Sequence, residues 1–155
     1  MPTSVYVPEG EVLEGNDVFL VSRVVRADGV YLSKADISTG YGTALTISVY
    51  DLSDRSISQD NVFQLSKTGA EITAGVTGLF IAATASGLST DGYWDGLDTT
   101  GYNFMYRLLF DATGATGPNL EGGKRYRVEF DLVTTTSFGT VRWAHILSVR
   151  SMSGT

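Results

Sequence analysis

Residues 125–132 read Arg-Tyr-Arg-Val-Glu-Phe-Asp-Leu, and this stretch decides the fold. Its four apolar residues alternate strictly with four charged ones, which is the period of a β-strand with one buried and one solvated face. A polar segment at 134–139 and a second alternating run follow it. We therefore predict a terminal β-hairpin formed by residues 124–133 and 140–149.

Further strands are predicted upstream, separated by segments rich in glycine, aspartate and serine. The first of them, 18–25, is a nearly continuous valine-rich run, which predicts burial on both faces. No stretch of twelve or more residues has a clean helical period, so no crossover helix is expected and the sheets should be mostly antiparallel. The predicted upstream strands lie at 18–25, 30–32, 45–50, 62–65, 79–85 and 104–110.

This pattern predicts an all-β chain folded as an antiparallel Ig-like β-sandwich, with a jelly roll or a small β-barrel as alternatives. A length of 155 residues suits one domain. Residues 1–16 contain Pro2 and Pro8 and are expected to form an extended N-terminal arm or an edge strand, because proline is tolerated at sheet edges. A single β-sandwich domain at 17–150 and a short tail at 151–155 complete the predicted organisation.

Composition argues against several classes of function. The chain has no cysteine, which excludes disulfides, thiolate metal sites and cysteine nucleophiles. Its net charge of −6 argues against nucleic acid as a partner. We see no signal-peptide pattern, and the longest nearly apolar stretch, 76–85, is too short to span a bilayer. We therefore expect a soluble protein with no membrane partner, assembled in a reducing cytoplasm.

Candidates for catalysis or metal binding are few. His145 is the only histidine, and a lone histidine in a strand is expected to be structural or superficial. A Ser-His-Asp arrangement stays open, although the G-x-S-x-G motif is missing. Asp91, Asp95 and Asp98 resemble a calcium-binding loop in chemistry but not in EF-hand spacing, and a solvated turn is the simpler interpretation. We expect no enzymatic activity, no catalytic residue, no metal site and no cofactor.

An aromatic-rich segment supplies the first candidate contact residues, Tyr93, Trp94 and Tyr102. Exposed tyrosine and tryptophan bury much area at little entropic cost, so these rings are suited to a sugar or to a neighbouring subunit. The alternative is that Phe104 and one other aromatic residue plug an open end of the sandwich.

The second set of candidate contact residues is basic: Arg125, Arg127 and Arg142, expected on the outer face of the terminal hairpin. Arginine is favoured at interfaces, so this face is a candidate contact for an acidic partner. The simpler interpretation is a solvated sheet surface on which the arginines pair with Glu129 and Asp131.

A resemblance to a known group of proteins adds to these inferences. Residues 91–110 (DGYWDGLDTTGYNFMYRLLF) and 122–130 (GGKRYRVEF), with 5–11 and 45–52, resemble small Ig-like β-sandwich proteins encoded among the head and neck genes of tailed bacteriophages. The resemblance lies in a glycine- and aspartate-rich aromatic loop followed by a Gly-Gly entry into an alternating terminal hairpin.

The resemblance implies a non-enzymatic virion component, assembled in a bacterial host and present in multiple copies. We expect a capsid decoration or cement protein that binds the major capsid protein and stabilises the shell, or else a head-neck or tail protein that binds neighbouring virion proteins. A carbohydrate-binding or adhesin module is the alternative from another class. A hydrolase that uses the three loop aspartates is the least favoured.

Overall fold

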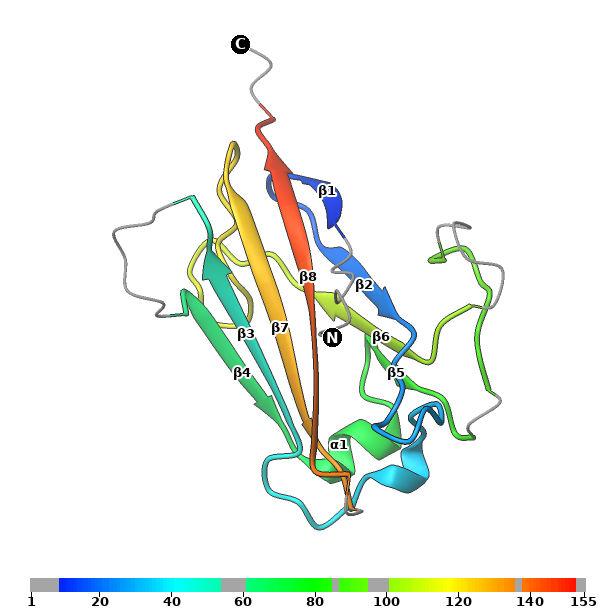
Figure 1. Ribbon diagram of the computed structural model, residues 1–155. Helices are drawn as coiled ribbons and strands as arrows, with labels where there is room; N and C mark the ends of the chain where they lie inside the picture. Colours follow the sequence, from blue (N-terminus) through cyan, green and yellow to red (C-terminus); the bar gives the residue numbers. More distant parts are fainter. Residues whose placement is uncertain (1–8, 54–60, 85–86, 95–100, 136–137, 153–155) are drawn as a thin grey trace, which may run out of the picture.

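The computed structural model describes residues 9–53, 61–84, 87–94, 101–135 and 138–152. These residues form two β-sheets that enclose the hydrophobic core between them (Figure 1). Helix is limited to a short 3-10 turn, η1 (Lys34–Asp36), and one short helix, α1 (Gly69–Ala74). The prediction of an all-β chain is confirmed.

The larger sheet has five strands and the smaller sheet has three. In spatial order the larger sheet contains β1 (Glu9–Leu13), β8 (Thr140–Arg150), β7 (Arg125–Val133), β3 (Leu45–Asp51) and β4 (Phe63–Lys67). In the same order the smaller sheet contains β2 (Val18–Ser22), β6 (Phe104–Leu108) and β5 (Leu79–Ile81). The terminal hairpin predicted from the alternation at 125–132 is confirmed as β7 and β8.

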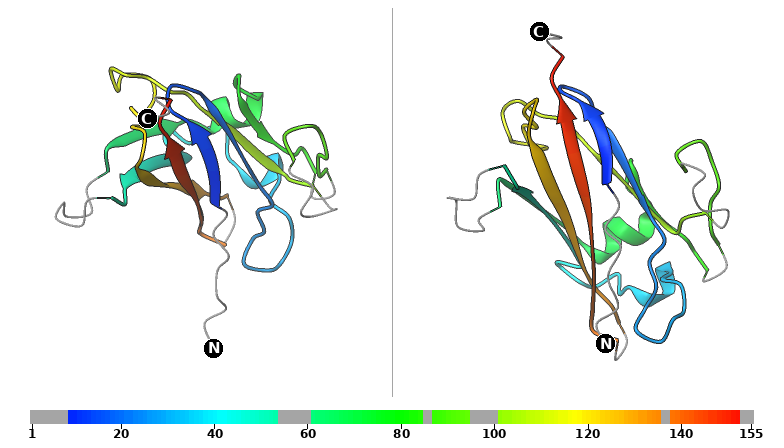
Figure 2. Two further views of the ribbon diagram at one scale, coloured as in Figure 1. Left: turned by 90° about the horizontal axis from the view of Figure 1, so that it is seen from above. Right: turned by 45° about the horizontal axis from the view of Figure 1, so that its top comes forward.

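Every pairing between these strands is antiparallel except that of β1 with β8, which is parallel. The chain turns sharply after β1, where Gly15 has a φ of +83°, and it then enters the opposite sheet as β2 (Figure 2). Residues 9–13 of the predicted arm therefore form an edge strand, whereas residues 1–8 lie outside the described residues.

The core is built from the inward-facing residues of both sheets, as the alternation predicts. Val128, Phe130 and Leu132 of β7 are completely buried. Phe104 of β6 packs edge-on against Phe130, with ring centroids 5.0 Å apart, and Trp143 of β8 stacks on Phe130 at 5.3 Å. This aromatic cluster joins the two sheets at the middle of the sandwich.

Three local predictions need correction. The run 18–25 was expected to be buried on both faces, but β2 ends at Ser22 and only Leu20 of the strand is fully buried, because no second layer of described residues covers the smaller sheet. The segment 30–32 contributes a single bridge, from Tyr31 to Val25. Helix α1 was not expected, although Thr68 and Glu71 form the capping box that marks its start.

Candidate functional site

The outer face of the larger sheet carries the basic residues that the sequence placed there. We call it the charged face. Arg125 and Arg127 project from β7, and Arg142 projects from β8 with 76% of its side chain exposed. Each arginine of this face has a carboxylate partner on the same face. The pairs are Arg125–Glu9 (2.9 Å), Arg127–Glu129 (2.7 Å), Arg142–Asp131 (2.6 Å) and Arg150–Glu11 (2.9 Å).

This pairing means that the charged face presents alternating charge rather than a basic patch. Arg127 also lies over the ring of Tyr50, with the guanidinium carbon 4.9 Å from the ring centroid. Two of the ion pairs, Arg125–Glu9 and Arg150–Glu11, attach β1 to the rest of the sheet. The three predicted arginines therefore lie together, but their charge is largely satisfied inside the molecule.

The outer face of the smaller sheet has the opposite character, and we call it the aromatic face. Its outward residues are mostly apolar and only partly exposed, and strand pairing places them in rows across the sheet. One row joins Val21, Met105 and Phe80, and the next pairs Phe19 with Arg107. These residues form the base of a candidate contact surface.

The segment 87–94 lies beside this base and is fastened to it at Tyr102. Ser89 and Tyr102 exchange two backbone hydrogen bonds, of 2.8 and 2.9 Å. Gly101 permits this approach, because its φ is +81° and a Cβ there would lie 2.2 Å from the Ser89 carbonyl oxygen. The Asp91 carboxylate accepts hydrogen bonds from the Tyr102 hydroxyl (2.5 Å) and from the Tyr93 amide (3.0 Å).

The three predicted aromatic contact residues take different positions. Tyr93 is 51% exposed, and its ring lies on Phe19 with centroids 4.3 Å apart. Trp94 is partly exposed and stacks on Tyr102 at 6.1 Å. Tyr93 and Trp94 therefore belong to the aromatic face together with the outward residues of β2, β5 and β6.

The prediction that Tyr102 is an exposed contact residue is wrong, since its exposed fraction is 1%. Its ring lies between Trp94 and the edge of Phe80, at centroid distances of 6.1 and 5.8 Å, and burial, reinforced by the bond to Asp91, raises the pKa of its hydroxyl. The alternative was that Phe104 and one other aromatic residue plug an open end of the sandwich. Phe104 and Tyr102 are both buried, but Phe104 belongs to the aromatic cluster between the two sheets.

Arg107 is the cation of the aromatic face, and it also has a partner. Its guanidinium contacts Asp17 at 2.6 Å and lies 5.8 Å from the centroid of the Phe19 ring. The backbone amide of Phe110 and the Arg107 guanidinium lower the pKa of the Asp17 carboxyl. The ion pair between Arg107 and Asp17 forms one end of the aromatic face.

His145 is buried between the sheets, with an exposed fraction of 5%. Its Nε2 lies 2.6 Å from the Oγ of Ser22, so β8 and β2 are joined by a polar contact across the core. Burial lowers the pKa of the imidazole to about 4, so the ring is neutral at physiological pH. The structure thus brings a serine and a histidine together, but among the described hydrogen bonds no carboxylate orients the ring.

A calcium site at the aspartate loop gains no support from Asp91, whose oxygens already accept hydrogen bonds from Tyr102 and Tyr93. Asp95 and Asp98 lie outside the described residues. Within the described ranges no group of three histidine, cysteine, aspartate or glutamate residues is arranged to hold a metal ion.

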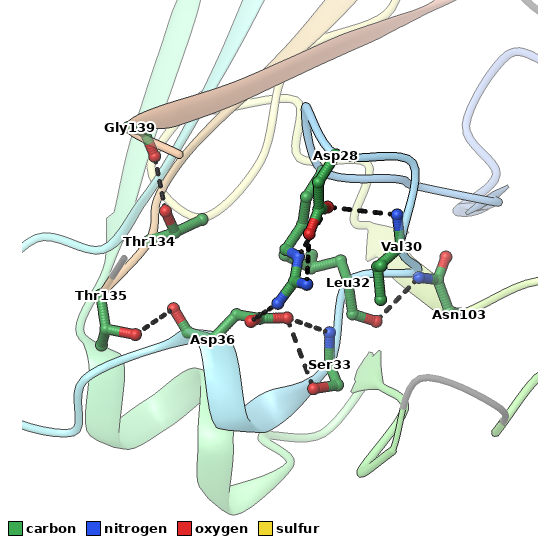
Figure 3. Close-up of polar contacts among 10 residues, drawn as sticks. Asp28, Val30, Leu32, Ser33, Asp36, Asn103, Thr134, Thr135 and Gly139 are labelled. Atoms are coloured by element: carbon green, nitrogen blue, oxygen red, sulfur yellow. Dashed lines mark hydrogen bonds and ion pairs between the residues drawn. The ribbon is translucent and has the colours of Figure 1, made fainter. Parts of the chain in front are cut away.

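Sequence reasoning missed a polar cluster at one end of the sandwich, centred on Asp36 (Figure 3). The buried Asp36 carboxylate pairs with Arg26 at 2.5 Å and accepts the amide hydrogen of Ser33 at 2.9 Å. The Asp36 carbonyl accepts from the amide of Thr135 at 2.7 Å, which ties η1 to the segment after β7. The Ser33-x-x-Asp36 capping pattern was the available signal.

The completely buried Asn103 lies next to this cluster. Its side chain donates to the carbonyl oxygens of Val24 and Leu32 and accepts from the Val24 amide. All of these donors and acceptors are consumed within the fold, so the cluster is a structural element and offers no group to a ligand.

Comparisons with protein-family models, with curated proteins and with solved structures find no match. Neither helix in the described ranges has the length and apolar character needed to cross a membrane. The functional interpretation therefore rests on the residues and their arrangement.

Proposed function

We propose that this chain is a non-enzymatic structural component of a tailed-phage particle, a decoration protein that binds the coat-protein shell in multiple copies. The sequence resemblance to Ig-like proteins of phage heads and necks is the starting point. A position at the head-neck junction or in the tail is the alternative within the same particle. Two features of the fold and one surface support this proposal.

The strand order supports an Ig-like sandwich. With β2 to β8 in the roles of strands B, C, C′, D, E, F and G, the larger sheet follows the order G-F-C-C′ and the smaller one the order B-E-D. These are the neighbours expected in variable-type Ig domains. A jelly roll would instead interleave two four-stranded sheets.

Tyr126 supports the same assignment. It stands near the start of β7, the strand in the F position, and its hydroxyl accepts a hydrogen bond of 3.0 Å from the Glu121 amide five residues upstream. A tyrosine that bonds back to the preceding backbone at this point is the tyrosine corner of Ig-like domains. Tyr126 is 2% exposed, so the contact is part of the core.

The aromatic face is the observation that carries the binding role. It combines the half-exposed Tyr93 with Phe19, Trp94 and Met105 on a rigid sheet. Aromatic residues that are already ordered lose little entropy on binding, which suits a repeated contact with a particle surface. The charged face lacks this quality, because its arginines already have partners.

Cosedimentation provides the test. The purified chain is mixed with shells assembled from the coat protein encoded in the same genome, and saturable binding is expected. Tyr93→Ala should weaken binding at least tenfold, as expected for a central aromatic contact. Gln64→Ala, at an exposed position on β4, is the matched control and should bind normally. A genome without a coat-protein gene, or binding that Tyr93→Ala leaves unchanged, contradicts the proposal.

A carbohydrate-binding module is the second candidate, favoured by one observation. The exposed Tyr93 ring stacks on Phe19, and the backbone amide of Tyr93 is bonded to the Asp91 carboxylate. Stacked rings with nearby polar groups are the usual elements of a sugar site. A glycan array distinguishes the two candidates. Saturable sugar binding that is lost in Tyr93→Ala, together with no binding to shells, would replace the phage proposal with this one.

A further inference from the structure

Strand β8 is covered by a neighbour along only part of one edge. It has eleven residues, and β1 pairs with the last five, from Ile146 to Arg150. Beside Thr140–His145 no strand of the described residues pairs with that edge, whereas the other edge pairs with β7 along the strand.

The backbone groups of Arg142 and Ala144 point toward this uncovered edge. Successive residues of a strand direct their amide and carbonyl groups to alternate sides. The Val149 amide donates to the Lys124 carbonyl on the β7 side, while the Arg150 carbonyl accepts from Glu14 on the β1 side. Even-numbered residues therefore face β1, and at 142 and 144 the same groups are available to an added strand.

Strand β1 shows which chemistry this edge accepts. Its outward residues Glu9 and Glu11 form ion pairs with Arg125 and Arg150, each at 2.9 Å, and its inward Val12 is buried in the core. The strand that already pairs with this edge therefore places acidic residues on the outer side and an apolar residue on the inner side.

The uncovered part of β8 offers the same two contacts. Arg142 lies on the outer side with 76% of its side chain exposed, and it forms an ion pair with Asp131 of β7. Val141 and Trp143 lie on the inner side and are partly exposed. Among the described residues the buried indole N–H of Trp143 has no hydrogen-bond acceptor.

We propose that the edge of β8 at Thr140–His145 binds an extended segment of a partner protein as an added strand in line with β1. The segment places a carboxylate beside Arg142 and an apolar side chain against Trp143, and its backbone pairs with Arg142 and Ala144. Addition of a strand to an exposed edge is a general mode of peptide recognition. The inference is independent of the proposed phage role, since it specifies the chemistry of the segment and not its source.

The opposite edge of the sheet is a weaker acceptor. Strand β4 has five residues and leads directly into the capped helix α1. Its outward residues Gln64 and Ser66 are uncharged, so they specify no charged partner.

Hydrogen exchange followed by NMR on the full chain is the first test. The amides of Arg142 and Ala144 should exchange at least about 100-fold faster than those of Ser148 and Arg150, which face the carbonyl groups of β1. Equal protection of all four amides would mean that the edge is already paired, and it would overturn the proposal.

The second test uses a synthetic peptide with the sequence of residues 9–14, Glu-Gly-Glu-Val-Leu-Glu, and a version with lysine in place of each glutamate. At millimolar concentration the acidic peptide should slow exchange at Arg142 and Ala144 at least tenfold and shift the Trp143 indole signal. No protection, or changes confined to Ser148 and Arg150 where the peptide would displace β1, overturns the proposal.

Three variants make the test specific. Ala144→Pro removes an amide from the uncovered edge while leaving the bonds to β7, and it should abolish binding without unfolding the chain. Arg142→Glu should reverse the preference, so that the lysine peptide binds better. Gln64→Glu adds the same charge on β4 and should change nothing. A preference that Arg142→Glu leaves intact rejects the proposed contact.

A shortened chain that begins at residue 9 is the last variant to test, because residues 1–8 directly precede β1. Binding of the acidic peptide to both the full and the shortened chain is the expected result. Binding to the shortened chain alone would show that the protein's own residues 1–8 take the edge, and it would overturn the assignment to a partner.

Discussion

The two outer faces of this sandwich differ in how completely each satisfies its own groups. On the charged face, the arginines of β7 and β8 form ion pairs with carboxylates on the same surface, so their charges are balanced by neighbouring side chains and by solvent. On the aromatic face, the outward residues of β2, β5 and β6 are mostly apolar, and the segment 87–94 covers them only in part. The exposed charges of the charged face are therefore largely paired within the molecule at little gain in stability, whereas the partly exposed apolar area of the aromatic face is suited to a contact.

Tyr102→Ala, beneath the aromatic face, should reduce the free energy of unfolding more than any substitution on the charged face. The substitution removes a buried ring that supports Trp94 and Phe80, and a large-to-small change in a core costs about 3–5 kcal/mol of unfolding free energy. Urea denaturation measures the loss, with Tyr93→Ala as the control, expected to stay within about 0.5 kcal/mol because its side chain is half exposed. A small effect at Tyr102 would mean that the aromatic face needs no buried support.

The pH dependence of the unfolding free energy should report the buried His145 in the interior. The pKa of His145 falls from 6.5 to about 4 on folding, so the unfolded chain binds more protons between these values. Stability should therefore be complete above pH 6.5 and should decrease by about 3 kcal/mol as the pH falls to 4.

His145→Gln is the control for that titration. It keeps a polar partner for Ser22 but does not titrate, so its unfolding free energy should change little between pH 6.5 and 5. A wild-type profile that is flat between pH 6.5 and 5 would contradict a neutral, buried His145.

The sequence-based predictions were accurate for the charged face and less accurate for the aromatic face. The hairpin of β7 and β8 was predictable because the alternation of apolar and charged residues over the eight positions 125–132 reports local burial directly. The positions of Arg125, Arg127 and Arg142 followed from the same alternation. Tyr102 was not predictable, because its burial depends on Gly101, Asp91 and Trp94 folding back over the end of β6.

The parallel addition of β1 to β8 was equally hidden from local pattern, since it joins residues more than 130 positions apart. The ion pairs Arg125–Glu9 and Arg150–Glu11 are visible only once that pairing is known. The buried Asn103 was missed for a related reason, because its partners Val24 and Leu32 lie more than 70 positions away in the sequence. Asp36 is a different case, because its capping pattern with Ser33 was a local signal.

Asp91→Ala should have an intermediate effect that is specific to the aromatic face. The Tyr102 hydroxyl would lose its acceptor in a buried position, which costs about 1–3 kcal/mol. The stacking of Trp94 on Tyr102 should loosen as well, and a change in tryptophan fluorescence reports it. Asp28→Ala, which removes a carboxylate that pairs with Arg26 and not with Tyr102, is the control and should leave the fluorescence unchanged. Unaltered fluorescence in Asp91→Ala would show that stacking alone holds the segment.

The smallest effect is expected on the charged face, from a double-mutant cycle of Arg142→Ala and Asp131→Ala. The two side chains are 76% and 40% exposed, and water screens their attraction despite the 2.6 Å contact. Their coupling should therefore be below about 1 kcal/mol in urea denaturation, and it should shrink further in molar salt because the Debye length falls to about 3 Å. A coupling of several kcal/mol that survives high salt would mean that the pair is shielded from solvent, and the contrast between the faces would then lose its physical basis. A small, salt-sensitive coupling would show instead that Arg142 can exchange Asp131 for another carboxylate at little cost, which the proposed addition of a strand beside Arg142 requires.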